Sequence, residues 1–138
     1  MTKDELCEVR ELRRLYKLEL ERYRQLEAAI HGLTAHVNGL PRPPNAGSRV
    51  EKLALLLIEV TDRLHNLREQ IFTAEAELAA ALVLADITPA EREILSLRYV
   101  AGLSFIEVAR RTNRSIGSVF KIHRAALKKA VDGQSADS

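Results

Sequence analysis

The chain has 138 residues, of which 46% are hydrophobic and only 4% aromatic, and its net charge is +2. A chain of this size can bury one elongated core but not the two large cores of a doubly wound enzyme. The lone Cys7 excludes an internal disulfide. Apolar runs such as residues 53–58 are far shorter than the roughly 20 residues of a membrane span. We therefore expect an all-α, cytoplasmic protein.

The first predicted helix runs from Thr2 to about His31. Its apolar positions recur at steps of three and four, the spacing that places side chains on one helix face, and only Glu19 is out of register. These positions are Val9, Leu12, Tyr16, Tyr23, Leu26 and Ile30. The segment from Gly32 to Gly47, GLTAHVNGLPRPPNAG, contains glycines and prolines that end helices and allow the chain to reverse.

A second, longer helix is predicted from Ser48, where Ser48 and Glu51 form a capping box, to about Ala85. Over roughly 38 residues, or ~57 Å, its apolar positions keep a coiled-coil spacing. They are Val50, Leu53, Leu57, Val60, Leu64, Leu67, Ile71, Ala74, Leu78, Ala81 and Ala85. Residues 1–86 should therefore form an antiparallel helical hairpin with a loop at 32–47. Its Ala-rich end, 74–85, should pack against the remaining domain or a second subunit.

The last third of the chain, residues 87–131, is predicted to form three short helices, followed by a disordered tail at 132–138. Capping boxes occur at Thr88–Glu91 and Ser104–Glu107, and Ser115 is a third helix start signal. Asn113 stands where a tight turn between crossed helices requires a residue that tolerates a positive φ. Apolar or small side chains that would pack the last two helices together are Val108, Ala109, Val119 and Ile122. This spacing predicts a helix-turn-helix.

Charge separates this segment from the rest of the chain. Residues 88–131 contain nine basic and three acidic residues, a net charge of +6, whereas residues 1–87 contain 12 basic and 14 acidic residues. Cations clustered on one helix are favoured by counterion release from a polyphosphate, whereas a merely solvated face mixes both signs. We therefore expect double-stranded DNA to be the partner.

The run EREILSLRYVAGLSFIEVARRTNRSIGSV, residues 91–119, resembles the fourth conserved region of bacterial sigma factors. That resemblance implies a last helix that enters the major groove, with RNA polymerase as a second partner. It places Arg98 at a backbone-contacting position. This sequence departs from the family where Phe120 replaces a frequent basic residue and Ile106 a frequent acidic one.

Together, charge and resemblance predict a set of DNA-contacting residues in and around the last two helices. Gly117 belongs to this set because a glycine costs a helix interior roughly 1 kcal/mol relative to alanine. A backbone brought close to DNA would justify that cost, but a place in the first helical turn would also make it small. The predicted residues are Arg98, Arg110, Arg111, Arg114, Ser115, Ile116, Gly117, Ser118, Phe120, Lys121, Arg124 and Lys128.

The preceding helix pair lacks tryptophan and any aromatic segment suited to melting a promoter, so we do not expect a complete initiation factor. A pair of long helices before such a helix-turn-helix resembles small phage-encoded late transcription regulators of the ArpU and RinA type. The hairpin is either a passive spacer or an arm for dimerisation or polymerase docking. We expect a homodimer through the hairpin, because one helix-turn-helix contacts few base pairs.

No catalytic or metal-binding pattern is found in the sequence. The four histidines lack Cys or His partners at ligand spacing, and no glycine-rich phosphate loop is present. We expect no cofactor and no enzymatic activity. The leading hypothesis is a sequence-specific transcription regulator of phage or prophage origin. Two alternatives stay open: a terminase small-subunit-like packaging protein, which would form a ring, and a polymerase- or activator-binding module that reads no bases.

Overall fold

The computed structural model describes residues 1–34 and 46–132, and within them every regular element is helical. The elements are α1 (Lys3–Thr34), α2 (Ala46–Leu84), α3 (Pro89–Leu95), the π-helical turn η2 (Ser96–Val100), α4 (Phe105–Thr112), α5 (Ile116–Leu127) and the π-helical turn η3 (Lys128–Asp132). The all-α prediction is confirmed. The predicted loop at 32–47 and tail at 132–138 fall mostly on residues 35–45 and 133–138, which lie outside the described part.

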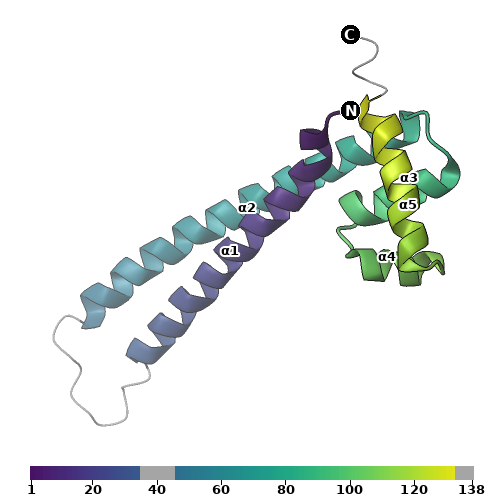
Figure 1. Ribbon diagram of the computed structural model, residues 1–138. Helices are drawn as coiled ribbons and strands as arrows, with labels where there is room; N and C mark the ends of the chain where they lie inside the picture. Colours follow the sequence, from purple (N-terminus) through teal and green to yellow (C-terminus); the bar gives the residue numbers. More distant parts are fainter. Residues whose placement is uncertain (35–45, 133–138) are drawn as a thin grey trace. The chain divides into compact units, whose positions relative to one another are not determined.

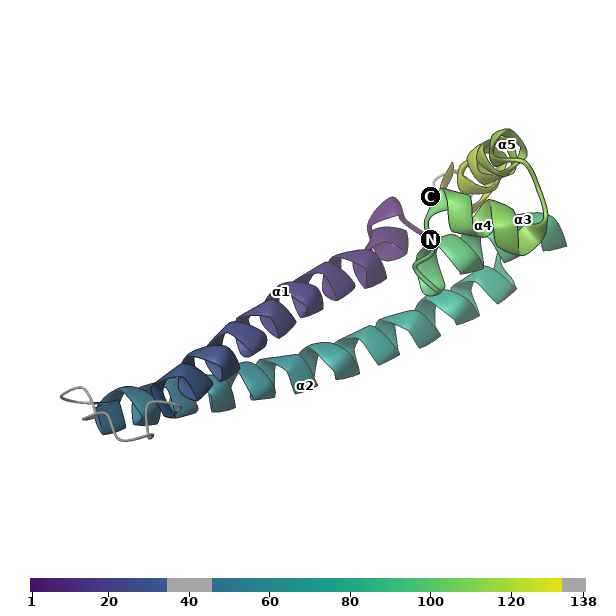
Figure 2. The ribbon, with the colours of Figure 1, turned by 90° about the horizontal axis from the view of Figure 1, so that it is seen from below.

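The chain divides into two compact units, each built from segments of both long helices. Unit 1 comprises Met1–Leu12 and Ile71–Ser138, and unit 2 comprises Arg13–Gln70. Within unit 2, α1 and α2 run side by side in both Figure 1 and Figure 2.

The helices of unit 2 are antiparallel. Arg68 donates a hydrogen bond of 2.8 Å to the Tyr16 hydroxyl, and Arg63 lies 3.7 Å from Glu19. Residues later in α1 thus contact residues earlier in α2, as in an antiparallel pair. The predicted apolar positions of α2 in this unit are all buried or half-buried, namely Val50, Leu53, Leu57, Val60, Leu64 and Leu67. Burial of these two apolar faces against one another stabilises the pair.

Unit 1 has a core that joins the Ala-rich end of α2 to the C-terminal helices. Leu78 and Leu82 of α2 pack in one cluster with Leu95 of α3 and with Ala126 and Ala130, while Leu6 and Val9 of α1 lie in the same cluster. Burying one such leucine contributes about 1.5–3 kcal/mol. Of the two partners expected for residues 74–85, the C-terminal domain is thus one that they contact.

The opposite face of the same stretch of α2 has no protein cover. Phe72 is 75% exposed and Leu84 is 86% exposed, and Val83 is also exposed. Since Phe72, Ala76 and Ala80 follow one another at a spacing of four, they share one face of the helix. This apolar face of residues 72–84 therefore meets solvent.

The junction between α2 and α3 is held by Arg92. Its guanidinium donates to the carbonyl oxygens of Leu82 at 3.0 Å, Ala85 at 3.3 Å and Ile87 at 3.4 Å. The last carbonyls of a helix have no partner within the helix itself, so a side chain that binds them caps it. Arg92 thereby fixes the end of α2 relative to the start of α3.

Candidate nucleic-acid interface

The two helices predicted to form the DNA reader pack through a small core. Val108 and Ala109 of α4 are buried with Val119 of α5 and Ile94 of α3, and Ile122 packs against this cluster. The assignments of Val108, Ala109, Val119 and Ile122 to the helix interface are thus confirmed.

The turn between α4 and α5 is closed by Asn113, whose φ is 56° and ψ is 43°. The Asn113 N–H donates to the Arg110 carbonyl at 3.3 Å, and the Arg114 N–H donates to the Ala109 carbonyl at 2.9 Å. This pair of bonds is a Schellman motif, which ends a helix with one left-handed residue. The predicted positive φ at Asn113 is confirmed.

The helix starts also follow the sequence signals. Thr88 and Ser104 each accept a hydrogen bond from the backbone three residues on, and Glu91 and Glu107 complete both capping boxes. Ser115 caps α5 by accepting from the Ser118 N–H at 3.1 Å. These caps set where α5 begins, and therefore which residues occupy its first turns.

Helix α5 has one buried and one exposed face. Val119 and Ala126 are fully buried, whereas Gly117, Lys121 and Arg124 are exposed at positions spaced by four and three residues. This spacing places the three on one helix face, which Lys128 extends into η3. A carbon atom added to Gly117 would have no neighbour within 4 Å. Gly117 is the second residue of α5, so the glycine lies in the first turn.

Six of the predicted cations are solvent-exposed. Within the part of the chain that the structure describes, none of the six forms an ion pair with an acidic side chain. They are Arg110, Arg111, Arg114, Lys121, Arg124 and Lys128. A cationic surface of this kind attracts a polyanion, because the bound counterions of the polyanion are released on contact.

Arg98, by contrast, is held inside unit 1. Its guanidinium carbon lies 4.2 Å from the centre of the Phe105 ring, and its Nη1 donates to the Leu103 carbonyl at 3.0 Å. Burial lowers the pKa of Arg98 from its ordinary value, with a smaller contribution from the charge of Arg10. The structure thus gives Arg98 partners within its own fold.

Phe105 joins Arg98 to the exposed face of α5 through an aromatic cluster. The Phe105 ring centre lies 4.8 Å from that of Phe120 and 4.9 Å from that of His123. The Tyr99 hydroxyl and His123 Nε2 are 2.7 Å apart. Burial lowers the pKa of His123, and the charge of Arg98 lowers it further. Burial raises the pKa of Tyr99.

The sequence did not indicate these internal partners. Phe105 lacks any motif that marks it as a support for Phe120, and Lys129 was counted with the other cations of the segment. In the structure, Lys129 Nζ lies 2.7 Å from Glu91 Oε1. Spacing along one helix identifies neither contact, because both join residues of different helices.

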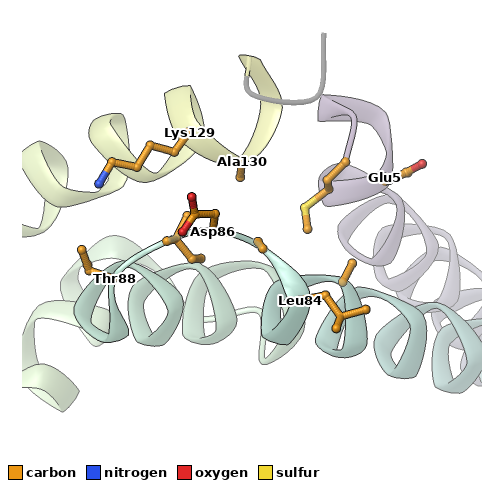
Figure 3. A pocket seen from close by; sticks show the side chains of 10 residues that line it. Glu5, Leu84, Asp86, Thr88, Lys129 and Ala130 are labelled. Atoms are coloured by element: carbon orange, nitrogen blue, oxygen red, sulfur yellow. The ribbon is translucent and has the colours of Figure 1, made fainter. Parts of the chain in front are cut away.

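A pocket of about 950 Å³ lies within unit 1, between the N-terminal residues, the end of α2 with the segment that follows it, and η3. Figure 3 shows Lys129 and Ala130 on one side of it, with Leu84, Asp86 and Thr88 opposite. None of the predicted DNA-contacting residues is among its lining residues. This pocket is therefore separate from the exposed face of α5.

Residues 83–129 match the family model described as Sigma-70, region 4. The match covers about a third of the chain and includes α3, α4 and all of α5. The resemblance of residues 91–119 to sigma factor region 4 is thus confirmed, and this segment is a DNA-binding helix-turn-helix. The likeness of the whole chain to regulators of the ArpU and RinA type stays a prediction. No curated protein and no solved structure matches the chain.

Within residues 1–34 and 46–132, no helix is long and apolar enough to span a membrane. Among the same residues, no group of three or more His, Cys, Asp or Glu side chains is arranged to hold a metal ion.

Proposed function

We propose that this chain is a sequence-specific DNA-binding regulator of transcription that reads the major groove with α5. The observation that carries this proposal is the exposed cationic face of α5, where Lys121 and Arg124 lie one turn apart beyond Gly117. The opposite face of α5 is buried in the core through Val119 and Ala126. The exposed face of α5 is thus the one available to DNA.

The first two turns of the helix are the part that reaches base edges in helix-turn-helix complexes. Ser115, Ile116, Gly117, Ser118 and Phe120 occupy this region and are proposed as the base-facing residues. Arg110, Arg111, Arg114, Lys121, Arg124 and Lys128 have the length and charge to bind phosphates around the groove. We propose Arg98 only as a secondary contact with the DNA backbone, because its guanidinium already lies over the Phe105 ring and donates to the Leu103 carbonyl.

We further propose that the protein is phage- or prophage-encoded. A pair of long antiparallel helices before a region 4-like reader is the arrangement of small late regulators of the ArpU and RinA type, and this likeness supports the assignment. RNA polymerase is proposed as a second partner on the basis of the family match.

We propose that two copies associate through the hairpin helices. The uncovered apolar face of α2, with Phe72 and Leu84, supports this, because water-exposed apolar surface of this kind is stabilised by burial against a second copy. Light scattering of the purified protein should give the mass of a dimer, and Phe72→Glu should shift it toward the monomer. A mass of eight or more copies would instead favour the DNA-packaging alternative.

The central experiment selects bound fragments from a pool of random duplexes and measures their affinity at several salt concentrations. We expect one enriched sequence, with a twofold repeat if the protein is dimeric. Lys121→Ala and Arg124→Ala should each weaken binding and reduce the slope of log affinity against log salt by about 1.

The matched control is Lys52→Ala, which removes the same charge from an exposed site on α2. It should change neither affinity nor slope, and the same is expected of Cys7→Ser. Equal affinities of Lys121→Ala, Arg124→Ala and wild type at low salt would contradict the proposal. Binding to RNA polymerase without any preference among duplexes would favour the interaction-module alternative.

A further inference from the structure

The exposed face of α5 is not uniformly polar. Ile116 and Phe120 are each 43% exposed, and both lie in the first two turns of the helix. They are four residues apart, so their side chains are neighbours on one face. An apolar pair therefore borders the stripe formed by Gly117, Lys121 and Arg124.

The Phe120 side chain is supported by aromatic packing against Phe105. Its ring packs on Phe105, which in turn is covered by the Arg98 guanidinium and met edge-on by the His123 ring. One side of Phe120 is therefore fixed by the fold while the other meets solvent. Restriction of this kind reduces the entropy lost when a partner binds.

The groove that α5 is proposed to enter presents only one apolar group. Thymine has a methyl group at C5, whereas cytosine has only a hydrogen atom at C5 and the purines present hydrogen-bond donors and acceptors. An apolar side chain set against a donor or acceptor leaves that group unpaired, which costs binding energy. Apolar residues at these positions are thus matched best by thymine.

We propose that Ile116 and Phe120 determine specificity by contacting the 5-methyl groups of thymines in the bound site. This inference rests on the proposed function, since it requires α5 to lie in the major groove. The Cβ atoms of residues four apart are roughly 5–6 Å apart, and bases on one strand rise by about 3.4 Å. The two thymines should therefore be one or two base steps apart.

Gly117 fits the same arrangement. It lies between Ile116 and the cations along the helix, and beyond its chain neighbours and the surrounding backbone of α5 no atom lies within 4 Å of the position its Cβ would take. A side chain there would stand between the helix backbone and the base edges. The absence of one lets the helix approach closely enough for the shorter Ile116 side chain to reach a methyl group.

The test uses deoxyuridine, which differs from thymidine only by the missing methyl group. Each thymine of the duplex enriched from the random pool is replaced singly, and affinity is measured for the full-length protein. Removing one contacted methyl should weaken wild-type binding about fourfold, the equivalent of ~0.8 kcal/mol per buried CH₂. One or two positions should respond and the others should not.

Protein variants assign each methyl group to a side chain. Phe120→Ala should abolish the deoxyuridine effect at one position, and Ile116→Ala should abolish it at the other. Phe120→Leu keeps an apolar side chain in case Phe120→Ala disturbs the contact with Phe105. The control is Ile106→Ala, which removes an exposed apolar side chain from α4 and should leave both effects unchanged.

The outcomes distinguish failure of this inference from failure of the proposed function. If no duplex is enriched, the proposed function fails. If a duplex is enriched but its affinity is insensitive to deoxyuridine at every position, only the thymine contact is overturned. Sensitivity that persists unchanged in both alanine variants also overturns it. Loss of polymerase binding in Phe120→Ala, with no change in DNA affinity, would show that the apolar pair binds protein instead.

Discussion

Lys129 Nζ lies 2.7 Å from Glu91 Oε1, so a cation at the end of the C-terminal helix pairs with a buried carboxylate at the start of α3. Glu91 also accepts a hydrogen bond from the Thr88 N–H at 3.2 Å. One carboxylate thus completes the cap of α3 and joins α3 to η3 through two residues that are 38 positions apart in sequence. The neighbouring Lys128 is exposed and has no such partner among the described residues.

Two adjacent lysines should therefore behave differently. Lys128→Ala should weaken DNA binding and lower the salt slope by about 1, with little change in stability. Lys129→Ala should instead reduce the free energy of unfolding by about 1–2 kcal/mol, because it leaves the Glu91 charge without its partner. Urea unfolding and salt-dependent binding distinguish the two. Equal effects of both substitutions on the salt slope would contradict the assignment of Lys129 to the fold.

Acid should destabilise the protein through Glu91. The hydrogen bond from Lys129 lowers the pKa of this carboxyl group below its ordinary value, with a further contribution from Thr88. A lowered pKa in the folded state gives stability that is present above the unfolded pKa and is lost as pH falls through the folded pKa. Glu91→Gln should thus be less stable than wild type at pH 7, and the difference should shrink below about pH 4.

Urea unfolding at pH 7 and pH 3.5 measures this difference. Glu93→Gln is the matched control, since Glu93 is exposed on the same helix. A gap between wild type and Glu91→Gln that stays constant across this range would rule out the coupling.

Mild acid should lower the stability of the fold through His123. Burial lowers the pKa of His123, so the unfolded chain takes up a proton at about pH 6.5 while the folded chain remains neutral at this site. Stability should therefore fall as pH decreases from about 6.5 toward the lower folded pKa. His123→Gln should remove this part of the pH dependence. Unfolding free energies at pH 7.5 and pH 5 provide the measurement, and an unchanged slope in the variant would exclude His123 as its source.

The turn before α5 should depend on Asn113. A β-branched residue at its positive φ is strained, so Asn113→Val should destabilise the fold by about 1–3 kcal/mol. Asn113→Gly should be tolerated, because glycine adopts this conformation readily. Asn66→Val, at an exposed position within α2, is the control and should cost only a few tenths of a kcal/mol. Similar losses at both sites would show that the turn geometry is not the cause.

Much of the fold could be predicted from the sequence because it follows local rules. The spacing of apolar residues predicted both long helices, the Thr88 and Ser104 caps predicted where α3 and α4 begin, and Asn113 marked the turn. Each of these signals lies within a few residues of the feature that it predicts. The observed helix bounds differ from the expected ones by a few residues, with α1 extending to Thr34 and α2 beginning at Ala46. Ser48 therefore lies inside α2, and the prediction that it caps the start of this helix is wrong.

The site was less predictable, because side chains with the same sequence signal have different partners in space. Arg98 and Arg124 are both arginines in a basic segment, yet Arg98 covers Phe105 whereas Arg124 faces solvent. The π-helical turn at 96–100 was not anticipated either. Which residues touch DNA stays a prediction, although the exposure of α5 permits the contacts proposed for it.

The bonds from Arg92 to the last carbonyls of α2 also bear on hydrogen–deuterium exchange. A helix end normally frays, and its amides exchange long before the interior opens. In this protein the end of α2 cannot fray unless the Arg92 guanidinium of α3 releases its hydrogen bonds to these carbonyls. The amides of these two segments should therefore become labelled together, as one cooperative opening, rather than from the helix end inward.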